Sequence, residues 1–331
     1  MIKYLSLFFV FIFIESAYAQ HTAFIPRNKA NKKEHERAVL GLPNDQLAIG
    51  SNLANIRILD PSLHVLNTIA LGTSAQEIRD LAYCAGKLFA MQSNDSSSLY
   101  RISLQNKAVE KINLNWQGKP IFFDGIASEN NTLFLIGDPV NGSFCTFRSL
   151  DGGNHWEPTP GSVSALEGEA AYAASGQTNQ IFNGNFYFVS GGLASRLFQS
   201  TNLGDSWTQH AIPYPSCPTC GPYAMALKNE LEIMTVGGNY LEPNKGEHNC
   251  YYTTDGGKTW QAPKKGPSGY RSCVIYANDK YFACGTNGID VSKNGGITWK
   301  KISEQNCLSM IVINKQLIVS LANGGYLIIE D

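Results

Sequence analysis

Short apolar segments separated by turn residues run along most of the chain. Residues 271–276 and 280–284 are two such segments on either side of an Asn-Asp pair, and residues 99–103 and 108–112 flank a connection of four residues. Segments of this length, bounded by Asn, Asp and Gly, are typical of antiparallel strands joined by tight turns. Few stretches have the apolar spacing of a long helix, so the pattern predicts an all-β chain.

One polar turn occurs four times within this pattern. Its copies begin at Ser149, Ser200, Thr253 and Ser292, and each reads hydroxyl, any residue, Asp or Asn, any residue, Gly, any two residues, Trp. The Asp or Asn can accept hydrogen bonds from backbone N–H groups, the Gly accepts a positive φ, and the Trp supplies a large apolar surface. No copy has the alternating oxygen ligands of a calcium loop, so no metal ligand is expected. We expect structural roles for the residues that define the turns, which are Asp151, Trp156, Asn202, Trp207, Asp255, Trp260, Asn294 and Trp299.

The spacing of the tryptophans gives the size of the repeating unit. They are separated by 51, 53 and 39 residues, the length of a four-stranded β-propeller blade with variable loops. With the repeated turn between the two outer strands, blades three to six fall at residues 122–159, 167–212, 221–263 and 270–302. Paired segments upstream keep the spacing without the motif and give blades one and two.

The end of the chain supplies three further strands, at residues 308–312, 316–320 and 326–329. Because a ring of blades must close, the fourth strand should come from residues 22–26, the free segment with strand character. The prediction is therefore a seven-bladed β-propeller of four-stranded blades. Six blades, with the N-terminal region outside the ring, is the alternative.

Residues 1–19 are typical of a secretory signal. Lys3 precedes an apolar run at residues 5–14 that is too short to span a bilayer, and Ala17 and Ala19 form a cleavage site. We expect an exported chain, periplasmic or extracellular, in which residues 20–331 form a single propeller domain. An uncleaved anchor is the alternative, and no later segment is long and apolar enough to cross a membrane.

The charge balance argues against some classes of partner. The 26 basic residues nearly equal the 27 acidic residues, so the chain lacks the basic footprint of a protein that binds nucleic acid or an anionic membrane. A GxSxG nucleophile elbow and a GxGxxG fingerprint after a strand are both missing. We expect no cofactor, and we expect a monomer.

Eight cysteines in a chain expected to be exported favour disulfides. The hairpin around residues 278–279 puts Cys273 opposite Cys284 on one face, which predicts a disulfide between them. Cys217 and Cys220 form a CxxC motif, for which we expect a structural disulfide, local or to another cysteine. A zinc site and a thiol redox role are the alternatives.

Polar residues recur where the inner strand of each predicted blade begins. In a propeller these positions, with the loops between the second and third strands, surround one mouth of the central channel, where ligands usually bind. Arg37 and Cys307 hold this position in blades one and seven. The alternative is that such residues solvate the channel and tie blades together by ion pairs. The candidate binding residues are Arg79, Asp80, Asp124, Asp138, Glu167, Glu169, Arg196, Tyr223, Tyr240, Tyr270 and Arg271.

The repeated turns resemble the Asp-box, or BNR, repeats of sialidases, sortilin ectodomains and photosystem II stability and assembly factor-like proteins. Further stretches, at residues 79–80, 123–125, 136–140, 167–176, 269–272 and 290–292, resemble a group of exported bacterial BNR-repeat propellers. The resemblance implies the propeller fold. From the assembly factor-like relatives, it also implies a non-enzymatic module that binds a protein or small polar ligand at the channel mouth.

The resemblance to sialidases implies a different function. A sialidase-like glycoside hydrolase would use paired carboxylates, such as Asp80, Asp124, Asp138 or Glu169. It would also need arginines from several blades, and Arg79, Arg196 and Arg271 could supply them. The Arg-Ile-Pro motif of that family is missing, because residues 24–27 read Phe-Ile-Pro-Arg. Glycoside hydrolysis is therefore the alternative to binding.

Overall fold

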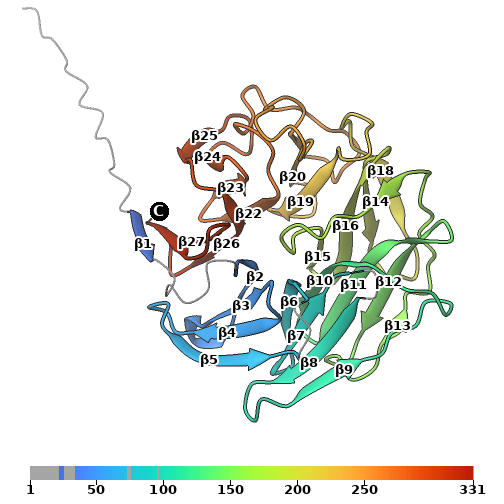
Figure 1. The fold of residues 1–331 in the computed structure, drawn as a ribbon. Helices are drawn as coiled ribbons and strands as arrows, with labels where there is room; N and C mark the ends of the chain where they lie inside the picture. Colours follow the sequence, from blue (N-terminus) through green and yellow to red (C-terminus); the bar gives the residue numbers. More distant parts are fainter. Residues whose placement is uncertain (1–21, 26–33, 73–75, 95–96, 331) are drawn as a thin grey trace, which may run out of the picture.

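Seven antiparallel sheets stand around a central axis like the blades of a propeller (Figure 1). The computed structural model describes residues 22–25, 34–72, 76–94 and 97–330. The seven-bladed prediction is confirmed, and the six-bladed alternative is wrong. The expected signal at residues 1–19 lies outside the described residues.

The first four blades follow one another along the chain. Blade one contains β2 (Glu36–Gly41), β3 (Leu47–Ser51), β4 (Asn55–Leu59) and β5 (Val65–Ala70), with a 3-10 turn, η1 (Pro43–Asp45), in its first hairpin. Blade two contains β6 (Ile78–Cys84), β7 (Lys87–Gln92), β8 (Ser98–Ser103) and β9 (Val109–Ile112). Blade three contains β10 (Phe123–Glu129), β11 (Thr132–Val140), β12 (Ser143–Ser149) and β13 (Glu157–Pro158). Blade four contains β14 (Glu169–Ala170), β15 (Asn179–Phe182), β16 (Asn185–Gly192), β17 (Arg196–Ser200) and β18 (Thr208–Ala211).

The last three blades include the end of the chain and its first described strand. Blade five contains β19 (Pro222–Leu227), β20 (Ile233–Gly237) and β21 (Cys250–Thr253). Blade six contains β22 (Cys273–Ala277), β23 (Lys280–Gly285), β24 (Gly288–Ser292) and β25 (Lys300–Ser303). Blade seven contains β26 (Cys307–Ile313), β27 (Gln316–Leu321), β28 (Tyr326–Glu330) and β1 (Thr22–Ile25).

Two blades depart from a simple run of four consecutive strands. In blade seven the fourth strand is β1, which pairs antiparallel with β28 and appears in blue beside the red end of the chain (Figure 1). In blade five the fourth strand is reduced to one bridge between Tyr252 and Gln261. Pro263 follows two residues later and has no N–H for a ladder, which explains why pairing stops there.

The apolar core lies between the blades. Phe134 of β11 stacks on Phe186 of β16 with ring centroids 4.6 Å apart, and Phe188 stacks on Phe198 within blade four. All four rings are buried. Because alternate side chains of each strand face the neighbouring sheet, the polar residues at the strand ends are left to surround the channel.

The repeated turns join the third strand of a blade to its fourth, and all four use the same hydrogen bonds. In the first copy the Ser149 hydroxyl accepts from the Gly153 N–H at 2.9 Å and donates to Asp151 Oδ1 at 3.0 Å. Asp151 Oδ1 also accepts from the N–H of His155 at 2.9 Å. The corresponding bonds of the other copies begin at Ser200, Thr253 and Ser292. The glycine of each copy has a φ of 80° or 90°, a conformation that favours glycine.

The structure contains two disulfides among its described residues. Cys217 bonds to Cys220, so the CxxC motif forms a local bridge, in agreement with the prediction. The predicted Cys273–Cys284 disulfide is wrong, because Cys284 bonds instead to Cys307 on β26 of the next blade. Cys273 does lie opposite Cys284 in the hairpin register. In a two-residue hairpin this is a hydrogen-bonded pair, where strands are farther apart, and the Cys273 thiol donates to Gln177 Oε1 at 2.8 Å.

Within the described ranges, no helix has the length and apolar character that crossing a membrane would require.

Candidate functional site

A pocket of about 670 Å³ opens at the channel mouth where the inner strands begin. Each of the seven blades contributes to its lining, from Arg37 in blade one to Ala322 in blade seven. Six of the eleven candidate binding residues are in this lining, which are Arg79, Asp124, Asp138, Tyr223, Tyr240 and Tyr270.

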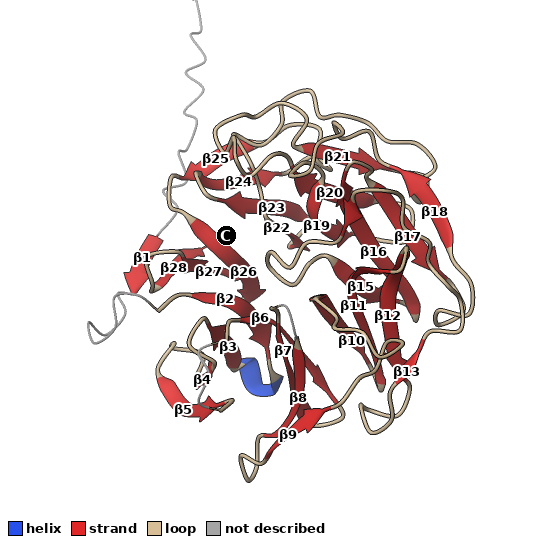
Figure 2. Ribbon diagram, turned by 45° about the vertical axis from the view of Figure 1, so that its right-hand side comes forward, coloured by secondary structure: helices blue, strands red, loops and turns tan. Residues whose placement is uncertain are grey.

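The floor of the pocket is formed partly by a segment that crosses the channel. Residues 171–178, here called the channel segment, connect β14 to β15, and the loop that leads into β15 extends toward the centre of the ring (Figures 1 and 2). The carbonyl of Ala173 accepts from Arg79 of blade two at 3.0 Å, and that of Ala174 accepts from Arg37 of blade one at 2.9 Å. On the other side, the Ser175 hydroxyl donates to the carbonyl of Ser272 beside blade six at 2.6 Å. The segment therefore links blades on opposite sides of the channel.

Glycine is required where the channel segment passes Asp80. Gly176 has a φ of 78°, and a Cβ atom at this position would overlap the Asp80 carboxylate. Both the backbone conformation and the space exclude a larger residue.

Two arginines of the pocket share one glutamate. Arg37 Nε donates to Glu77 Oε1 at 3.1 Å, and Arg79 Nε lies 2.8 Å from Glu77 Oε2 without the alignment of a hydrogen bond. Burial lowers the pKa of Arg79, and the Glu77 charge opposes this effect. Together with their bonds to the channel segment, these contacts hold both guanidinium groups in place.

Two carboxyl groups face the same pocket from blade three. Asp124 is 1% exposed, and neither of its oxygens makes a complete hydrogen bond with any residue that the structure describes. Burial raises its pKa well above the ordinary value, the Asp138 charge adds to this, and Arg79 and the nearby N–H groups of Ala173 and Asp138 oppose it. Asp138 Oδ1 accepts from the N–H of Ala171 at 3.1 Å, and burial raises the pKa of Asp138 to about 6.

Four tyrosines line another part of the pocket. Tyr172 of the channel segment stacks on Tyr223 with centroids 4.0 Å apart and ring planes 3° apart. Tyr270 and Tyr240 contact Tyr223 edge to face, at 4.9 Å and 6.3 Å. Tyr223 and Tyr270 are buried, whereas Tyr240 is exposed at the rim. We call these four residues the tyrosine wall.

Asp80 lies outside the pocket lining, under the channel segment. Its carboxylate accepts from the N–H groups of Leu81 at 2.8 Å and Ile126 at 2.7 Å, which joins blade two to blade three. Burial raises its pKa to about 8 despite these two bonds. The contacts are those of a residue that ties neighbouring blades together.

Glu169 and Arg196 also lie outside the pocket, and they bind each other. Arg196 Nε donates to Glu169 Oε1 at 2.7 Å, its Nη2 pairs with Oε2, and the Ser190 hydroxyl donates to the same carboxylate. Both side chains are buried. Glu167 is exposed and is absent from the lining.

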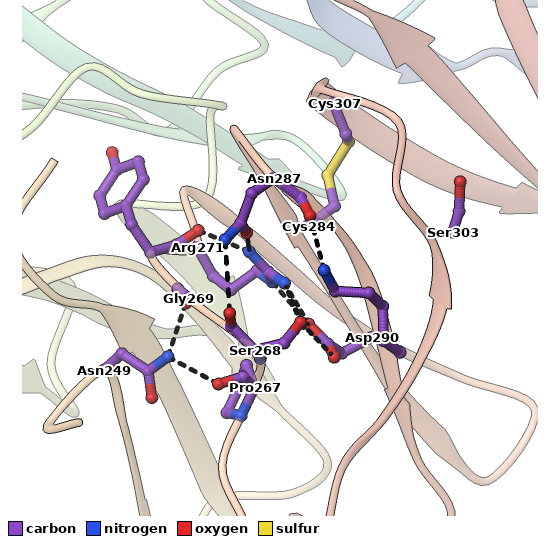
Figure 3. A network of polar contacts seen from close by, with 12 residues as sticks. Asn249, Pro267, Ser268, Gly269, Arg271, Cys284, Asn287, Asp290, Ser303 and Cys307 are labelled. Atoms are coloured by element: carbon purple, nitrogen blue, oxygen red, sulfur yellow. Dashed lines mark hydrogen bonds and ion pairs between the residues drawn. A yellow bond between two sulfur atoms is a disulfide. The ribbon is translucent and has the colours of Figure 1, made fainter. Parts of the chain in front are cut away.

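Arg271 is fully buried in a network behind the pocket (Figure 3). Its Nε donates to Asp290 Oδ2 at 2.7 Å, and its Nη2 donates to the Ser268 hydroxyl at 2.8 Å. Its Nη1 donates to Asn287 Oδ1 at 2.6 Å and to the carbonyl of Tyr270 at 2.8 Å. Arg271 therefore fixes the backbone that carries Tyr270 and does not face the pocket itself.

Sequence reasoning gave no role to Tyr172, although this residue completes the tyrosine wall. The available signal was its position in residues 167–176, a run rich in Ala and Gly that suits a backbone crossing a narrow space. In the part of the chain that the structure describes, no three His, Cys, Asp or Glu residues are grouped to hold a metal ion.

Comparison with known proteins supports the fold. Residues 251–262 match the BNR/Asp-box repeat, which covers the third copy of the turn. No curated protein matches the chain significantly.

Several solved structures share the architecture at low sequence identity. Virginiamycin B lyase from Staphylococcus aureus matches with a TM-score of 0.69 and 12% identity, over 94% of this chain and all of that one. YCF48 bound to D1 peptide matches with a TM-score of 0.65 and 11% identity, over 94% of this chain and 97% of that one. The GH74 enzyme of Niastella koreensis matches with a TM-score of 0.59 and 17% identity, over 90% of this chain and 43% of that one. At these identities the similarity shows the fold alone, and the chain is a seven-bladed β-propeller that carries the BNR/Asp-box repeat.

Proposed function

We propose that the chain is an exported BNR-repeat propeller that binds a segment of another protein at its channel mouth. The observation that carries the proposal is that the tyrosine wall continues outward onto exposed apolar side chains. Tyr240 is 48% exposed and Leu241 is 66% exposed, in the loop between β20 and β21. A small polar ligand would leave this apolar rim uncovered, whereas a peptide that extends out of the pocket would bury it.

The rim extends from the β20–β21 loop to the β16–β17 loop. The Thr219 hydroxyl donates to Asn239 Oδ1 at 2.8 Å, and the Ser216 hydroxyl donates to the carbonyl of the exposed Leu193 at 2.8 Å. The Cys217–Cys220 disulfide braces the turn between these two contacts. A braced rim loses less conformational entropy when a partner binds, which favours affinity.

Two further observations support parts of the proposal. YCF48, which shares the fold, has been solved with a bound peptide, and this is consistent with a protein partner. The disulfides support export, because disulfides persist in oxidising compartments, and the signal-like residues 1–19 point the same way. We propose that the exported form is a monomer that needs no cofactor.

Selection of a random linear peptide library on the mature chain, residues 20–331, tests the proposal. We expect enriched peptides whose affinity, measured by fluorescence anisotropy, falls roughly tenfold in Tyr240→Ala and Leu241→Ser. Leu66→Ser on β5 is the matched control, because the exposure of Leu66, 55%, lies between those of Tyr240 and Leu241, and Leu66 belongs to the outer strand of blade one. The proposal would be contradicted if no peptide is enriched, or if the enriched peptides bind the Tyr240→Ala and Leu241→Ser variants as tightly as the native chain.

Glycoside hydrolysis is a second candidate, favoured by one observation. Asp124 and Asp138 line one pocket, and burial raises the pKa of both, which suits the general acid of a carboxyl pair. The other proposed carboxylates are held elsewhere, Glu169 by Arg196 and Asp80 by backbone N–H groups.

A panel of aryl glycosides and sialosides tests this second candidate. Hydrolysis by the native chain that is lost in both Asp124→Asn and Asp138→Asn would support it. Absence of hydrolysis of every substrate in the panel would contradict a glycoside hydrolase function.

A further inference from the structure

The basic side chains of the pocket already have acceptors within the protein. Arg37 and Arg79 share Glu77, and each also donates to a carbonyl of the channel segment. These contacts join the segment to blades one and two. A ligand anion would have to compete with Glu77 and with two backbone carbonyls for the same guanidinium groups.

The acidic side chains of the pocket lack equivalent partners. The Asp124 carboxylate accepts no complete hydrogen bond from a described residue, although it is almost fully buried. Arg79 is near enough to lower the pKa of Asp124, but none of the ion pairs between described side chains includes Asp124 or Asp138. Asp124 has the N–H groups of Ala173 and Asp138 nearby, and Asp138 accepts from the N–H of Ala171, but neither carboxyl group forms an ion pair with a cationic side chain that the structure describes. What the pocket lacks is therefore a positively charged donor.

We infer that the bound protein segment inserts a cationic side chain, lysine or arginine, between Asp138 and the tyrosine wall, with Asp124 behind it. The inference rests on the proposed function and specifies the chemistry of its ligand. Asp138 supplies the counter-charge, and the ring of Tyr172, which is stacked on the buried Tyr223, supplies cation–π attraction.

Asp138 and the tyrosine wall are close enough to contact the same cation. Asp138 Oδ1 accepts from the N–H of Ala171, the residue before Tyr172, at 3.1 Å, so the carboxyl group of blade three lies beside the tyrosine wall. In agreement with this, burial raises the pKa of Tyr172 to about 12, and the Asp138 charge adds to this effect. A cation placed between them would be stabilised from both sides in a partly buried space, where such interactions are strongest.

The enriched peptides of the library selection provide the test. Each peptide is resynthesised with its lysine or arginine replaced by methionine, and both forms are titrated against the native chain, Asp138→Asn and Asp45→Asn. Asp45→Asn is the control, because Asp45 is exposed in the first hairpin of blade one and outside the pocket. Circular dichroism of every variant monitors folding.

We expect the native chain to bind the cationic form about tenfold more tightly than the methionine form, and Asp138→Asn to lose this preference. Asp45→Asn should keep it. If peptides are enriched and depend on Tyr240, but bind equally well without the cation, the inference fails while the proposed function stands. If no peptide is enriched, both fail.

Discussion

Burial governs the ionisation of the acidic residues in and under the pocket. It raises the pKa of Asp138 to about 6 and that of Asp80 to about 8, from an ordinary value of 3.8. A carboxyl group with a raised pKa holds its proton more tightly in the folded chain than in the unfolded chain. Its contribution to stability is therefore fully present at low pH and declines as the pH rises from the unfolded pKa to the folded one.

Asp138→Asn should remove the contribution of Asp138 to this loss of stability with rising pH. The amide oxygen can still accept from the N–H of Ala171, but the side chain cannot ionise. Relative to the native chain, the variant should gain about 2 to 3 kcal/mol of unfolding free energy between pH 4 and pH 7. Urea unfolding of both proteins at the two pH values measures this difference. A difference that does not change with pH would show that the carboxyl group is not desolvated.

Sequence position identified polar residues near the channel, but it could not identify their partners. Arg271 and Glu169 were predicted to bind a ligand, and each is instead paired inside the protein. Their partners, Asp290 and Arg196, lie 19 and 27 residues away along the chain. Only the packing of the strands shows that Arg271 and Glu169 already have ion-pair partners, whereas Asp124 and Asp138 form no ion pair among the described residues.

The repeated turns act as packing elements between blades as well as hairpin connections. The Gly153 backbone lies so close to Phe89 of blade two that a Cβ atom would overlap its ring, and Gly257 is similarly close to Leu197 of blade four. The glycine in the repeat is thus required by neighbouring packing as well as by its positive φ. Blades three to six could be located for this reason, because each of them contains the motif, whereas the other three blades were placed by strand spacing and ring closure.

The tryptophans of the turns should differ in their contribution to stability. Trp299 is 2% exposed and its indole N–H donates to the carbonyl of Gly296 at 3.1 Å, whereas Trp260 is only partly buried. We expect Trp299→Ala to cost about 3 to 5 kcal/mol and Trp260→Ala to cost less. Chemical denaturation of the two variants gives the comparison. Equal costs would mean that burial does not set the contribution of these residues.

Contacts between distant elements were beyond the sequence. The channel segment is held by arginines 94 and 137 residues away, and no local pattern records such pairings. The Cys284–Cys307 disulfide joins neighbouring blades, while hairpin register pointed to Cys273, which lies directly across from Cys284. Register predicts the cross-strand neighbour, but the side chain of Cys284 reaches the next blade.

Peptide mapping under non-reducing conditions should recover a cross-linked peptide that contains Cys284 and Cys307. Cys284→Ser/Cys307→Ser should lose about 3 kcal/mol of stability, because the disulfide closes a loop between residues 23 positions apart. The Cys217–Cys220 bridge closes a much shorter loop, so Cys217→Ser/Cys220→Ser should cost less and serves as the comparison. Recovery of a Cys273–Cys284 peptide would overturn the assignment.

The ring as a whole depends on one pairing between the two ends of the chain. β1 pairs with β28 from Thr22 opposite Ile329 to Ile25 opposite Tyr326, and it completes a sheet whose other strands all come from the last part of the sequence. A propeller buries the apolar face of each blade against two neighbours, so an incomplete seventh blade weakens its contacts with blades one and six. The pocket, which takes residues from all seven blades, depends on the same closure.

Deletion of residues 22–25 should therefore lower the melting temperature and weaken ligand binding together. Each kcal/mol lost should lower the midpoint by roughly 1 to 2 °C in a chain of this size, and thermal denaturation followed by circular dichroism measures the shift. Replacement of the same four residues by Gly-Ser-Gly-Ser keeps the chain length and should be nearly as damaging, because it removes strand propensity while leaving the connection. Blade five has three strands and one bridge, so the other blades can hold a reduced sheet in place. If both variants melt at the same temperature as the native chain, the neighbouring blades must hold blade seven in place as they hold blade five. The N-terminal strand would then not be required to close the ring.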